Sequence, residues 1–301
     1  MAKSKFPDKN LLINQIMITS ELVWRNNITR QKLDSWLSNF KGEVFAEKYE
    51  HELALWLLVN FVYYNESEVK HLCSMLFREF IHSNLIQEEG EIPECLVQLN
   101  KKVRFHFLGR SGESGAFLLY YFRKENKLSI RSFISDLDNL DDDVEEIVYV
   151  DDVTLSTGKQ SQAYKYLVED QKKIKNRKIT ILTLIASSKA IDFLKSQGYH
   201  IINCITLHER DRCFSDDSNI FHSHRDHQND CKKMMEYYGK KIYSANFPLG
   251  YNNSEYSFGF FYNTPDNTLP IFWSNNNWTP IIERYEKNYG NTEYSTLGRF
   301  L

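Results

Sequence analysis

Long apolar runs are missing from this sequence. The longest, residues 53–64, falls short of the roughly 20 residues that a helix needs to cross a bilayer, and Asn60 interrupts it. An earlier apolar stretch, LLINQIMI at residues 11–18, contains two polar residues and is not followed by a small-residue cleavage site. We therefore expect no membrane span and no signal peptide, and we expect the protein to be cytoplasmic.

An excess of charge of one sign is missing too. The chain has 37 Lys and Arg against 40 Asp and Glu, which gives a formal net charge of -3. Without a general basic field, affinity for nucleic acid would have to come from a local patch. Composition therefore leaves nucleic acid as a partner that is neither indicated nor excluded.

Cysteine pairs at the spacing of metal ligands are also absent. The five cysteines are scattered and include no C-x-x-C pair. Their odd number and irregular spacing disfavour both a disulfide framework and a zinc ribbon. We expect reduced thiols at all five positions, which are Cys73, Cys95, Cys204, Cys213 and Cys231.

Helical periodicity is present in the first third of the chain. In residues 65–83 the apolar positions recur at i, i+3, i+4 and i+7, and Asn65 or Ser67 can cap the start. Similar spacing over residues 33–45 and 49–64 predicts at least two further helices. We predict a helical domain over residues 1–95, ended by the charged, Gly- and Pro-containing stretch EEGEIPE at residues 88–94.

The predicted helices carry large aromatic residues. Trp36, Phe40, Trp56 and Phe61 are expected to pack in a core, and they supply more apolar surface than three helices can readily bury alone. The excess would be covered by the second domain, by a homodimer or by a partner protein. The sequence does not rank these three.

Strands and helices alternate in the second domain, which we place over residues 101–301. Each predicted strand is followed by a loop and then by a helical pattern, which indicates βαβ units and a parallel sheet. The fold class we predict is α/β, with the helical domain in front. The strands are expected at residues 103–109, 147–152, 178–187 and 199–209, and the helices at residues 116–127, 159–175 and 188–198.

Two loops at the carboxyl ends of predicted strands are candidates for ligand binding, because ligands of such sheets bind outside that edge. One is GRSGESG, residues 109–115, and the other lies within IVYVDDVTLSTGKQ, residues 147–160. Residues 156–161 of the second loop open a helix and offer hydroxyl groups, backbone N–H groups and the positive end of a helix dipole. Such a loop is suited to a phosphate group.

The paired acids Asp151 and Asp152 precede this loop and would repel a phosphate on their own. Ribose hydroxyls or a hydrated Mg²⁺ ion are the partners that suit them. A P-loop is excluded, because its first glycine position holds Val153 and Gln160 replaces the hydroxyl that binds the metal. Acids followed by a phosphate loop predict a phosphorylated sugar as ligand. The plain alternative for the acid pair is a strand-end turn with helix capping.

The stretch IVYVDDVTLSTGKQ resembles the phosphoribosyl diphosphate (PRPP) binding motif of type I phosphoribosyltransferases, and GRSGESG resembles their pyrophosphate loop. The chain is more closely similar to the phosphoribosyltransferase-like proteins of prokaryotic conflict and antiphage systems, some of them encoded with retrons. That similarity extends to WLSNF near the N-terminus, to DRCFSDDSNIF, and to YGKKIYSANFPLGY and NTPDNTLPIFW. It implies a type I phosphoribosyltransferase fold with a C-terminal hood.

The resemblance also implies roles for individual residues. Asp151 and Asp152 are the implied catalytic pair, which binds ribose hydroxyls or the waters of a Mg²⁺ cofactor. The implied reaction is displacement of pyrophosphate at the anomeric carbon. The implied 5-phosphate loop is Ser156, Thr157, Gly158, Lys159 and Gln160, and the implied pyrophosphate loop is Arg110, Ser111, Gly112, Glu113, Ser114 and Gly115.

Two features differ from the pattern of active phosphoribosyltransferases. One additional residue separates the acids from the Thr157–Gly158 pair, and residues 116–146 leave little room for the long hairpin that shields the reaction. Three functions therefore stay open. They are a ligand-binding effector of antiphage defence, a non-catalytic module that senses a nucleotide and binds a partner, and a salvage phosphoribosyltransferase.

Two further groups of residues are weaker candidates. The segment FHSHRDHQNDC brings His222, His224, Asp226, His227 and Cys231 close together, but it lacks the spacing of a known metal motif, so a polar surface segment is the simpler interpretation. Near the C-terminus, Tyr243, Trp273 and Trp278 can stack on a base, although aromatic residues there are more often part of a core.

Overall fold

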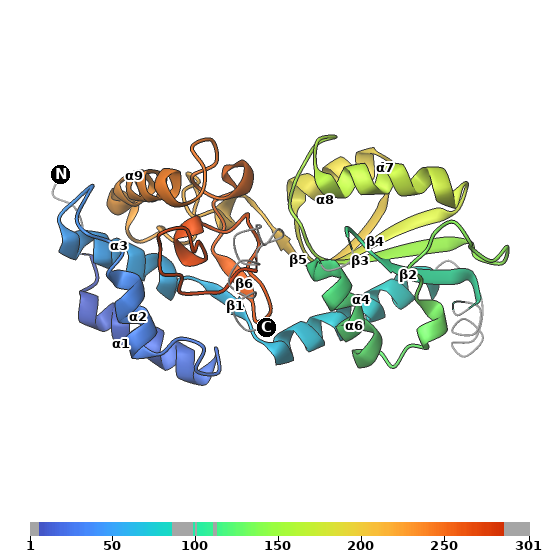
Figure 1. Ribbon diagram of the computed structural model, residues 1–301, viewed down its shortest axis with the longest axis horizontal. Helices are drawn as coiled ribbons and strands as arrows, with labels where there is room; N and C mark the ends of the chain where they lie inside the picture. Colours follow the sequence, from blue (N-terminus) through green and yellow to red (C-terminus); the bar gives the residue numbers. More distant parts are fainter. Residues whose placement is uncertain (1–5, 86–98, 100, 111–112, 286–301) are drawn as a thin grey trace, which may run out of the picture.

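A computed structural model describes residues 6–85, 99, 101–110 and 113–285, and these form two lobes (Figure 1). The larger sheet has the strand order β2-β3-β4-β5, and all of its neighbouring strands are parallel. Its strands are β2 (Val103–Phe107), β3 (Glu146–Thr154), β4 (Lys178–Ser187) and β5 (His200–Leu207). The predicted α/β class with a parallel sheet is therefore observed.

Helices cover both faces of this sheet. On one face lie α4 (Glu66–Leu85) and α6 (Ser114–Glu125), and on the other lie α7 (Gln162–Ile174) and α8 (Ser188–Ser196) (Figure 1). With a helix layer on each side, the central strands have few exposed residues, which explains their unbroken apolar runs. The helices predicted at residues 116–127, 159–175 and 188–198 are confirmed to within a few residues.

The second lobe is built from both ends of the chain. Its elements are α1 (Lys9–Leu22), α2 (Arg30–Leu37), α3 (Glu47–Val59), β1 (Val62–Tyr64), η2 (Glu209–Asp211), α9 (Arg225–Ile242), η3 (Tyr251–Asn253), β6 (Phe258–Phe260) and η4 (Pro270–Phe272). One buried cluster joins residues 12–63 to residues 213–282. Trp36 is central to it, because its indole N–H donates to the carbonyl of Ile271 at 2.8 Å and its ring stacks on Phe272.

This packing divides the chain differently from the predicted boundary. Helix α4 lies against the sheet lobe, whereas α1–α3 share their core with the C-terminal segment. The excess of apolar surface expected on the first helices is thus largely covered within the chain. The predicted boundary stretch, residues 88–94, lies outside the described residues.

Local contacts explain where the predicted helices end. The pattern at residues 33–45 predicts one helix, but α2 ends at Leu37 because the carboxylate of Glu50 accepts from the backbone N–H groups of Gly42, Val44 and Phe45. Residues 62–64 continue the apolar run of α3, yet they form β1, which pairs in parallel with β6. The predicted cap is confirmed, since the Asn65 side chain accepts from two backbone N–H groups at the start of α4.

Some surface features bear on association. Within the described part of the chain, no helix combines the length and the apolar character that a bilayer crossing requires. Leu11, Ile18 and Leu22 are exposed on α1 at helical spacing. A partner or homo-oligomer at this end of the molecule stays a prediction.

The described cysteines, Cys73, Cys204, Cys213 and Cys231, are free thiols, and Cys95 lies outside the described residues.

Candidate functional site

The acid pair lies near the carboxyl end of β3. Asp152 is buried and accepts hydrogen bonds from the phenol of Tyr262 at 3.1 Å and from the backbone N–H of Val153 at 2.9 Å. Asp151 is half-buried, and one of its carboxylate oxygens accepts from the backbone N–H of Asp152. Two carboxylates are therefore held side by side at the edge where ligands of parallel sheets bind.

Crowding of negative charge changes how these acids titrate. Burial, followed by the charges of Asp152 and Glu113, raises the pKa of Asp151 well above its ordinary value. Burial also raises the pKa of Asp152, and hydrogen bonds from Ser114 and Tyr262 oppose that rise. The pair is consequently an acidic cluster whose repulsion a cation or hydroxyl donors would relieve.

The first predicted loop approaches the acid pair from β2. A Cβ atom on Gly115 would lie 3.0 Å from the carbonyl oxygen of Leu108 and 3.3 Å from a carboxylate oxygen of Asp151, so glycine allows α6 to start close to the acids. Glu113 turns back into its own loop, where its carboxylate accepts from the backbone N–H of Arg110 at 3.3 Å. The expectation that Glu113 faces the pyrophosphate as part of its binding loop stays a prediction.

The remaining residues of that loop are placed unevenly. Arg110 is exposed, and Ser114 hydrogen-bonds with Asp152. Ser111 and Gly112 lie outside the described residues. The loop thus brings Glu113, Ser114 and Gly115 to the acid pair, while its other predicted contacts stay predictions.

The second predicted loop runs from the end of β3 to α7. Gly158 has a φ of +92°, a backbone conformation that side chains with a Cβ atom rarely adopt. The hydroxyl of Ser161 accepts from the backbone N–H of Tyr164 and caps the helix. These features make a tight turn that presents the first turn of α7, as a phosphate loop requires.

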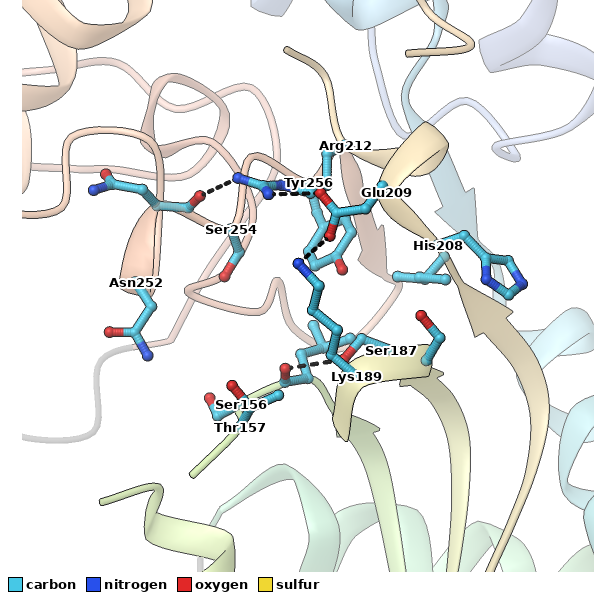
Figure 2. A pocket seen from close by; sticks show the side chains of 14 residues that line it. Ser156, Thr157, Ser187, Lys189, His208, Glu209, Arg212, Asn252, Ser254 and Tyr256 are labelled. Carbon is cyan, nitrogen blue, oxygen red and sulfur yellow. Dashed lines mark hydrogen bonds and ion pairs between the residues drawn. The ribbon is translucent and has the colours of Figure 1, made fainter. Parts of the chain in front are cut away.

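A cavity of about 140 Å³ opens beside this second loop, between the sheet edge and the other lobe (Figure 2). Ser156 and Thr157 lie on one side of it, and Asn252 and Ser254 lie on another. The full lining is Leu155, Ser156, Thr157, Ser187, Ser188, Lys189, Leu207, His208, Glu209, Arg212, Asn252, Asn253, Ser254 and Tyr256.

Charged side chains connect the two lobes across this cavity. Lys189 and Arg212 both pair with Glu209, at 2.5 Å and 2.9 Å, as the dashed lines in Figure 2 show. Arg212 also pairs at 3.3 Å with the buried carboxylate of Glu255. The cavity is therefore polar and charged, and its cations come from both lobes.

A family comparison agrees with this geometry. The sequence model of the PRTase-CE family matches residues 33–284, which include both loops, the acid pair and most of the two lobes. The chain belongs to the PRTase-CE family. It is a phosphoribosyltransferase-like protein, as the motif predicted. A search of curated proteins found no match.

The acidic cluster of this PRTase-CE protein suits a metal that arrives with its ligand. Among the described residues, no group of three or more His, Cys, Asp or Glu is placed to hold a metal ion. Mg²⁺ typically uses one or two carboxylates together with substrate phosphates and waters. Asp151 and Asp152 could supply the two carboxylates of such a site. They do not by themselves make a metal site in which all ligands come from the protein.

Four of the weaker candidates, namely His224, His227, Trp273 and Trp278, have structural roles. His227 is buried and its ring nitrogen contacts the phenol of Tyr49 at 2.6 Å, while the ring of His224 packs edge-on against Trp56. Trp273 and Trp278 are buried, and their indole N–H groups donate to backbone carbonyls. The polar surface interpretation of the histidine segment is therefore wrong for His227, which belongs to a core.

Several residues at the site of this PRTase-CE protein were not predicted from the sequence. Lys189 follows the strand at residues 178–187, so the rule that pointed to the first two loops would also have found it. Glu209 and Arg212 follow the next strand in the same way. Tyr262 carried no local signal, because its contact with Asp152 depends on the fold of the C-terminal segment.

Proposed function

We propose that the chain binds PRPP, or another ribose phosphate, together with Mg²⁺ at the edge of the sheet where β2 and β3 end. The observation that supports this most strongly is the arrangement of Asp151 and Asp152 between two loops. One loop begins α6 and the other begins α7. Acids flanked by two helix starts suit a ligand with hydroxyl groups at its centre and anionic groups at its ends.

Each part of the ligand has matching chemistry in the chain. The ribose hydroxyls would donate to the carboxylates of Asp151 and Asp152. The 5-phosphate would accept from the hydroxyl and backbone donors of the loop from Ser156 to Gln160. Bound Mg²⁺ would neutralise the charge of the diphosphate group. The diphosphate would lie towards the loop from Arg110 to Gly115.

Calorimetry with PRPP and MgCl₂ tests the proposal. Asp151→Asn combined with Asp152→Asn should weaken binding by at least ~100-fold, because two charged partners of the ligand are lost. Asp142→Asn combined with Asp143→Asn is the matched control, since it removes the same charge from an exposed loop. Wild-type affinity in the first double variant, with folding intact, would reject the site.

A non-catalytic role is the second candidate, and one observation favours it. Residues 113–146 contain α6 and the short 3-10 helix η1 (Ile130–Ser132), and this fully described segment has no β-hairpin. A reacting ribose would therefore lack the shielding hairpin that the resemblance associates with transfer. Binding of PRPP without release of pyrophosphate, in the presence of nucleobases, would support sensing over transfer.

We also propose that the protein acts in antiphage defence, because its sequence resembles the phosphoribosyltransferase-like proteins of antiphage systems. Challenge of cells with phage would compare the wild type with the double Asn variant at positions 151 and 152. Loss of protection in the variant, at equal protein level, supports a defence effector that needs the ligand. Neighbouring purine or pyrimidine synthesis genes would instead favour salvage.

A further inference from the structure

The cavity in Figure 2 is lined by residues from the beginning of the second loop, which include Ser156 and Thr157. Leu155, Ser156 and Thr157 of the loop line it, whereas Gly158 and the capping residue Ser161 do not. A phosphate held by the first turn of α7 would therefore leave this cavity free. A second ligand can bind next to the first one, with the loop between them.

The charged groups in and behind the cavity do not cancel. Lys189 and Arg212 line it and share one acidic partner, Glu209. Behind them, the buried Glu255 pairs with Arg212 at 3.3 Å and with Lys232 at 3.2 Å. Among these five side chains, three cations face two carboxylates, and Arg212 is fixed in place by its buried partner.

The carboxylate of Glu209 occupies the position that the anionic group of a ligand could take between Lys189 and Arg212. The side chains of Lys189 and Glu209 are 64% and 45% exposed, so their ion pair contributes little to stability. When Glu209 moves away, Lys189 and Arg212 both become available to another anion. Arg212 does not follow, because Glu255 and the carbonyl of Asn253 hold its guanidinium.

The uncharged groups of the lining favour the same class of ligand. Ser188 and Lys189 form the first turn of α8, where backbone N–H groups have no acceptor within the helix. Ser156 and Thr157 add hydroxyl groups to the lining, whereas the hydroxyl of Ser254 already donates to the carbonyl of Tyr251. Of the two aromatic rings in the lining, that of Tyr256 is buried and offers little surface for stacking a flat base, and that of His208 is exposed.

We propose that this cavity is a second anion site, which takes the phosphate or carboxylate group of a ligand bound beside the ribose phosphate. The assignment of that ligand as a companion of a ribose phosphate rests on the proposed function. The anion site itself depends only on Lys189, Arg212 and the start of α8. The two ideas can therefore fail separately.

Titration of isotope-labelled full-length protein with inorganic phosphate or with acetate, at constant ionic strength, tests the site by NMR. The backbone amide signals of Ser188 and Lys189 should shift on titration. Lys189→Gln should weaken that response by at least about fivefold, because a charged hydrogen-bond donor is lost. Glu209→Gln should strengthen it by roughly two- to fivefold, because the competing carboxylate is removed.

Lys195→Gln is the matched control, since it removes one positive charge from the last turn of the same helix. Stronger binding of phosphate than of acetate assigns a phosphate-bearing ligand, and the reverse order assigns a carboxylate. Absence of shifts at Ser188 and Lys189, or equal responses in Lys189→Gln and wild type, overturns the site. Signals of Gly158 to Ser161 report separately on the proposed ribose-phosphate loop.

Discussion

At the scale of single residues, the acid pair makes the protein sensitive to pH. Asp151 has a raised pKa in the folded state, so the fold holds its proton more tightly than the unfolded chain does. The stabilisation from that proton is complete below the pKa of the unfolded chain and is lost as the pH rises through the higher folded pKa. As the pH rises between these two pKa values of Asp151, the acid pair therefore makes folding progressively less favourable.

Asp151→Asn should accordingly increase the free energy of unfolding at pH 7, by roughly 1 kcal/mol, the size of an ordinary single substitution. The gain should shrink towards pH 4, where the wild-type side chain is protonated as well. Urea unfolding across this range measures it, with Asp142→Asn as an exposed control. A gain that is the same at every pH would contradict the role of charge repulsion.

Gly158 offers a second test at the same scale, because Gly198 is a natural control for it. Both glycines have positive φ angles, +92° and +87°, and a Cβ atom on either would meet no atom within 4 Å. Replacement of either glycine by Ala should therefore lower the free energy of unfolding by about 1 kcal/mol through backbone strain alone. Only Gly158→Ala should weaken binding of ribose 5-phosphate in calorimetry, and equal losses in the two variants would argue against the loop assignment.

At the scale of elements, a stack of aromatic side chains connects the C-terminal segment to the acid pair. The ring of Tyr262 lies parallel to that of Phe260 at 5.3 Å and contacts Phe117 of α6 at 4.9 Å. Phe260 belongs to β6, which pairs with β1. The position of the phenol beside Asp152 is thus fixed by the second lobe.

Removing that phenol should weaken the ligand site without disturbing the core. Tyr262→Phe deletes one hydrogen-bond donor to Asp152, and we expect affinity for PRPP and Mg²⁺ to fall roughly tenfold. The pH at which binding is half-maximal should also rise, because that donor lowers the pKa of Asp152. Tyr121→Phe is the control, since Tyr121 packs on Phe261 but donates to Glu66. Equal effects of the two changes would exclude a specific role for Tyr262.

The elements differ in how far the sequence predicts them. The run at residues 178–187 could be recognised because both faces of the sheet are covered, so burial leaves a continuous apolar pattern. The run at residues 103–109, at an edge of the sheet, could be recognised because apolar and polar residues alternate in it. The end of α2 could not be recognised. The backbone N–H groups that follow it donate to the carboxylate of Glu50, which belongs to the next helix, α3. The acid pair and its loop have a local motif, whereas Tyr262 reaches the site only through long-range packing.

At the scale of the whole molecule, the lobe that contains the candidate site is enclosed in sequence by the other lobe. Residues 12–63 and 213–282 form one core, and the sheet lobe lies between them along the chain. We therefore do not expect residues from about 97 onward to bind the ligand by themselves. Without α1–α3, the apolar faces of α9 and η4 would be left in water.

A fragment that begins at Val97 should show no cooperative thermal transition, because the buried partners of Phe272 and Tyr238 are removed. Differential scanning calorimetry measures this against the full chain. Phe272→Ala in the full chain should lower stability by about 3–5 kcal/mol for the same reason. A fragment that unfolds cooperatively and binds PRPP would restore the division at residue 95.

The two segments that form the core of the second lobe are synthesised at different times. Helices α1–α3 emerge first, but the residues that complete their core, including Ile281 and Ile282, come only after the entire sheet lobe has been synthesised. During that interval the early helices expose apolar side chains to other molecules in the cell. Protection of the nascent chain by chaperones should therefore matter most before residue 282 leaves the exit tunnel.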